Sequence, residues 1–557
     1  MRWALVCVTV AAVAGVACQG GNTFTVDSTG DGADARGDGV CATSSGTCTL
    51  RAAIAEANNR DGHDVIAFDI SGSGVQLIRP ATRLPSLTDP AGATIDGYTQ
   101  DSAAVNTSAT ASNARLTIEL RGQGYQSFDG LVLTSPGNVV RGLSVWDFRI
   151  QVLLAGNSAD GNQVLGSFLG TNPAGTVGAS GFGSFSHGVH VDNGASGNRI
   201  GRPGNANRNV VSGNWQNGVS LYNLGTRANI IQNNIVGLRP DGLGALPNRS
   251  HGVDINAGAS DNLVGGTGGG ERNVVAGNGQ TGVEISHDPT TLGNDVIGNF
   301  IGTGVDGARA VRNGQYGVFL EGLAQCNATC TPDAGESTVS NNIIVNNNGG
   351  VAIMKGRHDD VLTNNHIGVL PNGTPAPNTV YGVRVEKGSM NTTVGPGNVI
   401  ARNGSGVQIQ AQGSNPGCEP PGETRGCDEA PTNGNTVTAN RIFLNTGFGI
   451  DLARFGEVTA DPGAKVNASI DIPVLSLSNG RVRARTCVGC TVELFVADTT
   501  STTQYGEGRD LLATEQADAT GLALFDTNVG QGRVVTATAT DAAGNTSEFS
   551  QNLAGPP

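Results

Sequence analysis

Four flat side chains recur at one position of a repeated motif. His187, His251, Tyr316 and Tyr381 each stand directly before a Gly-Val-x-(Val/Ile/Leu) sequence, and they follow one another at a nearly constant spacing. Flat rings of this kind stack on the apolar faces of sugars, so an evenly spaced row of them indicates contact with an extended glycan. The alternative is that the rings only pack on one another at a corner of the fold.

Polar side chains accompany the row within the same segments. The expected outward positions are His190, Asp254, Glu284 and Arg384, with Asp192, Asn256, Glu321 and Glu386 three to five residues after each glycine. Glycoside hydrolases need two carboxylates about 6.5–9.5 Å apart when they invert configuration. Asp254, Glu284 and Glu321 are therefore the candidates if the protein is a secreted polysaccharide lyase or glycoside hydrolase on a pectin-lyase-like β-helix.

Other acidic motifs favour structural roles. Val145-Trp146-Asp147-Phe148 resembles a pectate lyase motif but lacks its histidine, so we expect a core strand there. Asp359-Asp360 is a carboxylate pair, yet Asp360 follows Gly350 at the same distance along the chain at which Asn198 follows Gly188, which indicates an ordinary turn.

An acidic loop near the N-terminus is the one candidate for a bound ion. Asp27, Asp31, Asp34 and Asp38 could hold Ca²⁺, but they lack the alternating ligand order of an EF-hand loop. A solvated glycine-rich loop is the preferred interpretation, and the sequence predicts no metal and no other cofactor.

The elements that position these residues belong to a repeat. The glycine that opens the motif recurs from Gly188 to Gly449, and alternate members share the longer period that separates His187 from His251. A second column, which we take to start apolar segments, contains Asn209, Asn273, Asn342, Asn398 and Asn440. A third closes the segments 164–170, 230–237, 296–302 and 361–368 with glycine.

Three short β-branched segments per unit can bury their apolar faces only by stacking on neighbouring units. This pattern predicts an all-β protein, a right-handed parallel β-helix. Asparagine tolerates left-handed backbone and can bond along such a stack, which explains why it recurs at the turns. Because the period contains neither a leucine-rich nor a Trp-Asp signature, it does not favour a leucine-rich repeat or a propeller.

Composition and net charge argue against one class of function, nucleic-acid binding. The chain has 557 residues with 85 Gly and 22 Pro, and its 33 basic against 47 acidic side chains leave a net charge of −14. The only lysines are Lys355, Lys387 and Lys465, so no basic stripe for phosphates is expected and nucleic-acid binding is disfavoured.

The N-terminal segment that ends at Cys18 indicates export. An apolar run from Trp3 to Ala17 is too short to span a membrane and suits a signal peptide. It ends in Gly-Val-Ala-Cys, which resembles a bacterial lipobox and predicts a lipid on Cys18 as the only membrane contact. Cleavage after Ala14 is the alternative, so we expect either an outer-membrane lipoprotein or an extracellular protein.

Eight further cysteines fall into four close pairs. They are Cys41 and Cys48, Cys326 and Cys330, Cys418 and Cys427, and Cys487 and Cys490. Close pairs in even number predict disulfide-pinned loops in an oxidising compartment rather than zinc ligands.

The N-terminal region carries a resemblance to a known family. Residues 41–58, CATSSGTCTLRAAIAEAN, place apolar residues on one face of a helix and resemble the bacterial CSLREA domain, with Thr49 and Ala52 departing from its signature. Segments 67–72, 95–100 and 118–122 extend the resemblance into the repeats. It implies a cap before a parallel β-helix in an exported bacterial protein, and no particular activity.

After residue 460 the asparagine columns stop and period-two alternation begins, as in 481–486 and 534–540. This region resembles the immunoglobulin-like β-sandwich that closes such proteins. The predicted organisation is a signal peptide (1–18), a cap (19–90), a β-helix (91–460) and a sandwich (461–557). The preferred function is non-enzymatic adhesion or contact with a cell-surface polysaccharide, the alternatives being the enzyme above and a purely structural stalk.

Overall fold

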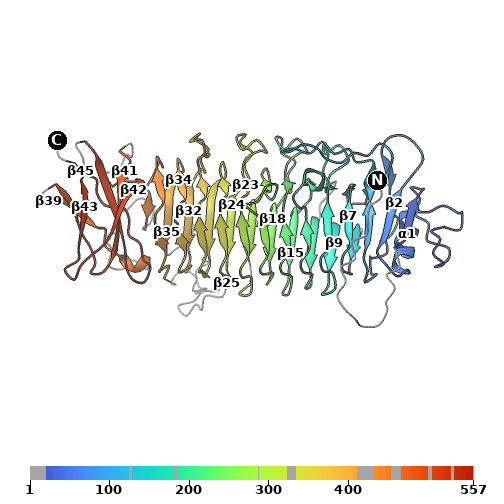
Figure 1. The fold of residues 1–557 in the computed structure, drawn as a ribbon, viewed down its shortest axis with the longest axis horizontal. Helices are drawn as coiled ribbons and strands as arrows, with labels where there is room; N and C mark the ends of the chain where they lie inside the picture. Colours follow the sequence, from blue (N-terminus) through green and yellow to red (C-terminus); the bar gives the residue numbers. More distant parts are fainter. Residues whose placement is uncertain are drawn as a thin grey trace, which may run out of the picture.

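The computed structural model describes residues 21–124, 128–179, 186–286, 288–322, 334–410, 431–452, 466–478, 480–499, 505–528 and 532–555. They form a long rod, a right-handed parallel β-helix with a helical cap at one end and a β-sandwich at the other (Figure 1). The fold predicted from the repeat is confirmed. Among these residues, no helix has both the length and the apolar character needed to cross a membrane.

Three parallel sheets run the length of the rod, and we call them sheets A, B and C in the order in which each coil visits them. Sheet A has 13 strands, sheet B has 12 and sheet C has 11. The strands of sheet A are β1 (Thr23–Val26), β2 (Asp64–Phe68), β4 (Ala93–Asp96), β7 (Val139–Arg141), β10 (Gln163–Leu165), β13 (Arg199–Ile200), β16 (Ile230–Ile231), β19 (Leu263–Gly265), β22 (Asp295–Ile297), β26 (Thr338–Ser340), β30 (Val361–Thr363), β33 (Thr393–Val394) and β36 (Thr436–Val437).

Those of sheet B are β3 (Gln76–Ile78), β5 (Ile118–Arg121), β8 (Leu143–Trp146), β11 (Phe168–Leu169), β14 (Asn209–Val211), β17 (Asn234–Val236), β20 (Val274–Val275), β23 (Phe300–Ile301), β27 (Ile343–Ile344), β31 (His366–Ile367), β34 (Val399–Ala401) and β37 (Arg441–Phe443). Those of sheet C are β6 (Leu131–Leu133), β9 (Ile150–Ala155), β12 (His187–Asp192), β15 (Val219–Tyr222), β18 (Val253–Asn256), β21 (Val283–Ser286), β24 (Tyr316–Glu321), β28 (Gly349–Met354), β32 (Tyr381–Glu386), β35 (Ser405–Gln410) and β38 (Ile450–Asp451). Sheets A and B begin within residues 19–90, so the cap and the solenoid share their first strands.

The core is a set of aliphatic columns inside the coils. In sheet C the residue after each ladder glycine points inward, and Val189, Val253, Val318 and Val383 are fully buried in one continuous core cluster. Burying a side chain of this size stabilises the fold by roughly 1.5–3 kcal/mol, which is why short β-branched strands suffice once they are stacked.

A ladder of buried asparagines occupies each of the three corners. At every rung a side-chain Nδ2 donates to the Oδ1 of the next coil's asparagine. The corner before sheet B holds Asn209, Asn234, Asn273, Asn299, Asn342, Asn365, Asn398 and Asn440. The corner before sheet C holds Asn214, Asn248, Asn278, Asn313, Asn347, Asn378, Asn403 and Asn445. The corner before sheet A holds Asn138, Asn162, Asn198, Asn229, Asn262 and Asn294.

These ladders confirm that asparagine bonds along the stack. Asn234, Asn299 and Asn365 of the glycine-ended segments alternate in one ladder with Asn209, Asn273 and the other members of the second column. The longer period of the sequence is thus two coils.

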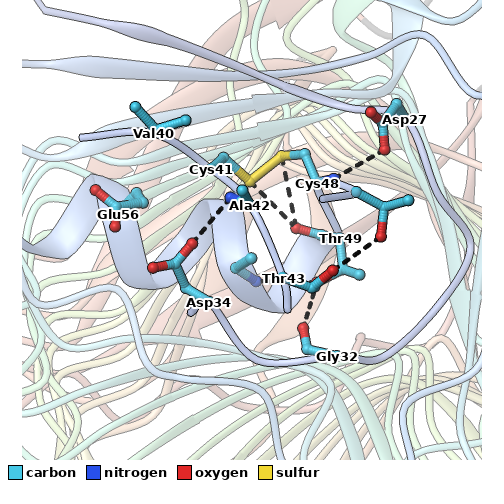
Figure 2. Close-up of a disulfide and its surroundings, with 12 residues drawn as sticks. Asp27, Gly32, Asp34, Val40, Cys41, Ala42, Thr43, Cys48, Thr49 and Glu56 are labelled. Atoms are coloured by element: carbon cyan, nitrogen blue, oxygen red, sulfur yellow. Dashed lines mark hydrogen bonds between the residues drawn. A yellow bond between two sulfur atoms is a disulfide. The ribbon is translucent and has the colours of Figure 1, made fainter. Parts of the chain in front are cut away.

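The N-terminal cap closes the first coil. Helix α1 (Leu50–Asn58) begins at Thr49, whose side chain accepts from the Ala52 N–H, and it packs against β1 and β2. A disulfide joins Cys41 to Cys48 directly before the helix (Figure 2). The predicted helix and disulfide are confirmed.

A second disulfide joins Cys487 to Cys490 in the C-terminal sandwich, again as predicted. Cys326, Cys330, Cys418, Cys427 and the signal peptide with Cys18 lie outside the described residues.

The sandwich has two antiparallel layers. The outer layer is β39 (Val474–Ser478), β40 (Arg481–Arg485) and β43 (Leu522–Asn528), and the inner layer is β42 (Gly508–Gln516), β41 (Thr491–Ala497), β44 (Val534–Thr540) and β45 (Leu553–Ala554). The remaining elements are the short pair β25 (Ala334–Gly335) and β29 (Arg357–His358) and the 3-10 helices η1 (Gly97–Thr99), η2 (Asn205–Asn207) and η3 (Asn467–Ser469).

The sandwich caps the last coil. Carboxylates of Glu493, Asp498, Glu507 and Glu548 accept hydrogen bonds from coil N–H groups at 2.7–3.2 Å. Phe495 and Phe549 of the sandwich also join the solenoid core. The N–H groups at this end of the stack are therefore hydrogen-bonded to the sandwich rather than exposed to solvent.

Candidate functional site

The outward faces of the three sheets differ in chemistry. On sheet B the outward column is largely apolar, and Phe168, Val210, Ile235 and Val274 pack with Leu238 under side turns. On sheet C the outward positions carry the charged residues that the sequence singled out. The outward side of sheet C is therefore the candidate site, and we call it the C face.

The C face consists of three columns in register. The first holds His187, Tyr316 and Tyr381, on β12, β24 and β32, together with His251, which lies two residues before β18. The middle column runs Leu153, His190, Ser220, Asp254, Glu284, Phe319, Ala352, Arg384, Gln408 and Asp451. The third runs Ala155, Asp192, Tyr222, Asn256, Ser286, Glu321, Met354, Glu386 and Gln410. Members of the first column lie on every second strand, about 10 Å apart, which confirms the predicted spacing.

The rings of the first column are packed as well as aligned. Tyr316 and Tyr381 stack with centroids 6.4 Å apart, and the Arg384 guanidinium lies 4.0 Å from the Tyr381 ring centroid. Tyr381 is 2% exposed, whereas Tyr316 is half-buried. These rings support each other across two coils, and only part of the row is open to a ligand.

The histidine end is arranged in the same way. His187 is buried and stacks on His190 at 5.0 Å. Burial, aided by the charge of neighbouring His190, holds the pKa of His187 well below its usual value. His187 is thus neutral and contributes a ring rather than a charge.

His251 brings the three predicted carboxylates together. Its Nδ1 lies 2.8 Å from Glu284 Oε2 on the next strand. Burial by itself lowers the pKa of His251, but the bond to Glu284 and the charges of Glu284, Asp254 and Glu321 outweigh it and raise that pKa. The cluster therefore stabilises the protonated imidazole of His251 relative to that of an isolated histidine.

Each of these carboxylates also has other partners. Glu284 Oε1 accepts from the Ser286 hydroxyl at 3.1 Å, and Asp254 Oδ2 accepts from Asn217 Nδ2 at 2.8 Å. Glu321 forms an ion pair with Lys355. The cluster is a connected network and not a set of solvated acids.

Arg384 organises the far end of the C face. Its Nε and Nη2 both donate to Gln408 Oε1, at 2.9 and 2.7 Å. Burial raises the pKa of the adjacent Glu386 carboxyl although Arg384 and Lys387 lower it.

The most open part of the C face was missed by sequence reasoning. Tyr222 is 39% exposed and Leu224 is 72% exposed, and the Tyr222 ring lies 6.2 Å from that of His190. The predicted row of rings stands before the glycine of alternate repeats, whereas Tyr222 stands after the glycine of an intervening repeat. Its position shortly after the ladder glycine Gly218 was the available signal.

Short polar groups border this tyrosine. The Asp192 carboxylate accepts from Asn193 N at 2.6 Å and from Asn223 Nδ2 at 2.7 Å. Burial would raise the pKa of Asp192, but hydrogen bonds from His190, Asn223 and the backbone hold it below the usual range. An exposed ring beside a fixed carboxylate and amides is suited to a sugar.

The other acidic motifs have partners within the fold. Arg121 pairs with Asp147 at 3.1 Å, and the Trp146 indole donates to Glu119. Asp360 occupies the ladder corner before sheet A, accepting from the Ser337 N–H at 3.1 Å.

The acidic loop of the cap is engaged with the protein itself. Asp31 pairs with Arg51. Asp27 accepts from the Cys48 N–H, and Asp34 accepts from the Ala42 N–H (Figure 2). Within the described ranges no group of three His, Cys, Asp or Glu side chains is placed to hold a metal ion.

Comparison with known proteins gives structural similarities only. No protein-family model matches the sequence, and no curated protein matches it. The chain is similar to a periplasmic alginate epimerase, AlgG, at 15% identity and a TM-score of 0.42, covering 70% of this chain and 73% of that one. It is similar to the A-module of the Azotobacter vinelandii mannuronan C-5 epimerase AlgE6 at 17% identity and a TM-score of 0.31, covering 73% and 94%.

A tailspike protein mutant of the E. coli bacteriophage HK620, in complex with a hexasaccharide, matches at 12% identity and a TM-score of 0.28, covering 93% and 85%. These values assign no function to the chain.

Proposed function

We propose that this protein is an exported bacterial β-helix protein that binds polysaccharide along the C face without acting on it chemically. The proposal includes a lipid anchor on Cys18 as its only membrane contact. The observation that carries it is the concentration of aligned rings and charges on one outward face of an otherwise apolar-cored solenoid.

The energetics of the C face support a binding role. Asp254, Glu284 and Arg384 are each 5–7% exposed. Burying charged side chains costs free energy, and apolar residues of similar volume in their place often make a protein more stable. A solenoid that needed only stability would carry apolar or asparagine columns there, as it does elsewhere.

The geometry of the C face supports an extended ligand. Eight strands from β12 to β35 present the three columns over about 34 Å, from a spacing of about 4.8 Å per strand. Parallel strands tied by three ladders make a rigid surface, which lowers the entropic cost of binding a long chain.

The partners of the carboxylates favour binding over hydrolysis. Glu284 is tied to His251 and Glu321 to Lys355, so neither is poised as a free acid or base. The meeting of Asp254, Glu284 and Glu321 around His251 keeps glycoside hydrolysis as the second candidate.

Retention on polysaccharides tests the proposal. Residues 19–557, purified from an oxidising compartment, are passed over a panel of neutral and acidic polysaccharides while reducing ends and ultraviolet absorbance are followed. We expect retention on at least one polysaccharide, no product, and at least about fivefold weaker retention for Tyr222→Ala, since a stacking contact on an aromatic ring is worth about 1–3 kcal/mol. Tyr505→Ala, on the sandwich, is the matched control.

The other outcomes are distinct. Product formation that stops in Glu284→Gln would make the protein an enzyme, with unsaturated sugars marking a lyase. Absence of both retention and product would leave a structural stalk.

A further inference from the structure

The outer layer of the sandwich forms the end of the rod. The inner layer carries Glu493 and Phe495 toward the last coil, while Val492 and Leu494 of the same strand β41 pack with Val482 of β40. The inner layer is thus enclosed between the solenoid and the outer layer. The outward side of β39, β40 and β43 therefore points away from the solenoid, at the opposite end of the rod from α1 (Figure 1).

We call this outward side the end face, and its central strand carries a row of arginines. Arg481, Arg483 and Arg485 alternate with buried Val482 and Ala484 along β40, and all three are exposed. Alternate residues of a strand lie about 6.8 Å apart, so the row is about 14 Å long.

The strands on either side leave the row accessible. Register places Ser476 of β39 and Leu524 of β43 beside Arg483, and Val474 and Leu522 beside Arg485. Serine and aliphatic side chains offer no charge to these guanidinium groups.

The three arginines of the end face differ in whether they form an ion pair. Arg481 pairs with Asp526 at 2.9 Å, both being largely exposed. Within the part of the chain that the structure describes, neither Arg483 nor Arg485 has an acidic partner. Two adjacent guanidinium groups are therefore uncompensated in a chain of net charge −14.

We propose that the end face binds an anionic polysaccharide through Arg483 and Arg485. Guanidinium groups form bidentate hydrogen bonds with carboxylate or sulfate groups, which a lysine cannot do. The site is separate from the C face and does not depend on it.

The shape and setting of the row favour a polysaccharide among polyanions. A single row of arginines one strand wide fits a linear chain. The turn that follows β40 holds the Cys487–Cys490 disulfide, which places the end face in an oxidising compartment, where linear polyanions are chiefly polysaccharides rather than nucleic acids.

Dextran sulfate and uncharged dextran are matched probes for this proposal. Residues 19–557 are tested on both, immobilised, at several salt concentrations. We expect salt-sensitive binding to dextran sulfate, none to dextran, and at least tenfold weaker binding for the double variant Arg483→Gln with Arg485→Gln. The double variant Arg483→Lys with Arg485→Lys should bind dextran sulfate more tightly than the double glutamine variant but less tightly than the parent.

Two controls distinguish the loss of this binding site from a general loss of positive charge and from unfolding. Arg199→Gln with Arg202→Gln removes the same charge from exposed positions on the solenoid and should leave binding unchanged. All variants should unfold at the temperature of the parent, because the replaced side chains are exposed.

Three results would overturn the proposal. They are unchanged binding in the double glutamine variant, equal binding to dextran, and preferential binding to phosphatidylglycerol vesicles or single-stranded DNA. Tyr222→Ala should not alter dextran sulfate binding, so a failure of the C face proposal and a failure of this one are distinguishable.

Discussion

Asn445 and Glu507 join the solenoid to the sandwich at the end of an asparagine ladder. The Asn445 side chain donates to Glu507 Oε1 at 2.9 Å, and its backbone N–H donates to Oε2 at 3.1 Å. The carboxylate takes the place that the next coil's asparagine would hold. The sandwich thus ends the stack by imitating another coil, which explains how a solenoid stops without an open edge.

This contact predicts a pH dependence of stability. Burial raises the pKa of Glu507 to about 7, although the bonds from Asn445 oppose it. The folded state therefore holds its proton more tightly than the unfolded state, whose pKa is near 4.5, so stability falls as pH rises between these values. The loss is about 3 kcal/mol.

Glu507→Gln removes that titration and keeps one of the two oxygens that accept from Asn445. We expect the free energy of unfolding of the parent, measured against this variant in urea, to fall progressively from pH 4.5 to 7.5. Glu515→Gln, an exposed change, should show no such trend. A constant difference between parent and Glu507→Gln would contradict the assignment.

The fold was predictable because its signals are local and repeated. The glycine at 188 and its later copies mark one turn of every coil, and stacking is the only way for three short strands to bury their faces. The sharing of one asparagine ladder by two kinds of segment was not predictable, since Asn234 and Asn299 stand in segments of different composition from Asn209 and Asn273. Only the register of sheet B shows that they share a corner.

The asparagine ladders predict large losses from single changes. Asn299 is fully buried; its Oδ1 accepts from the N–H and side chain of Asn273, and its Nδ2 donates to Val264 O. Asn299→Leu leaves several buried polar groups unpaired, at about 1–3 kcal/mol each, so we expect a loss above about 3 kcal/mol in urea unfolding. Asn372→Ala, in an exposed turn, should cost under about 1 kcal/mol, and an equal effect of both changes would refute the ladder's role.

The candidate site was only partly predictable. Spacing placed His251, Tyr316 and Tyr381 in one row, and the structure confirms the row. Their mutual packing and the exposure of Tyr222 depend on how neighbouring coils cover each other, which a single repeat does not encode.

His251 and Glu284 give a spectroscopic test of the C face. The carboxylate raises the pKa of the imidazole against burial, so Glu284→Gln should lower the pKa of His251. Titration of the imidazole carbon-bound protons by NMR measures this, with His251→Gln to assign the signal. Glu271→Gln, in the turn between β19 and β20, is the control, and an unchanged His251 pKa in Glu284→Gln would rule out the pair.

Arg357 and Asp360 form a buried ion pair at one corner of the solenoid. Both side chains are 0% exposed, with Nη2 to Oδ1 at 2.6 Å and Nε to Oδ2 at 3.0 Å, and Arg357 also donates to the Ser337 hydroxyl. Asp360→Asn restores the residue found at this corner in other coils, yet it leaves the guanidinium buried without its counter-charge. We therefore expect a loss of about 3–5 kcal/mol in urea unfolding.

The double variant tests whether Asp360 stabilises the fold through its ion pair with Arg357 or only as a rung of the corner ladder. Arg357→Met with Asp360→Asn removes the uncompensated charge and leaves an asparagine that can accept from the Ser337 N–H, so most of the lost stability should return. Arg357→Met alone leaves the Asp360 carboxylate buried without its counter-charge, so we expect it to destabilise the fold about as much as Asp360→Asn does. If the double variant is as unstable as the sum of the two single changes, the pair does not act as a unit, and Asp360 contributes only as a rung of the corner.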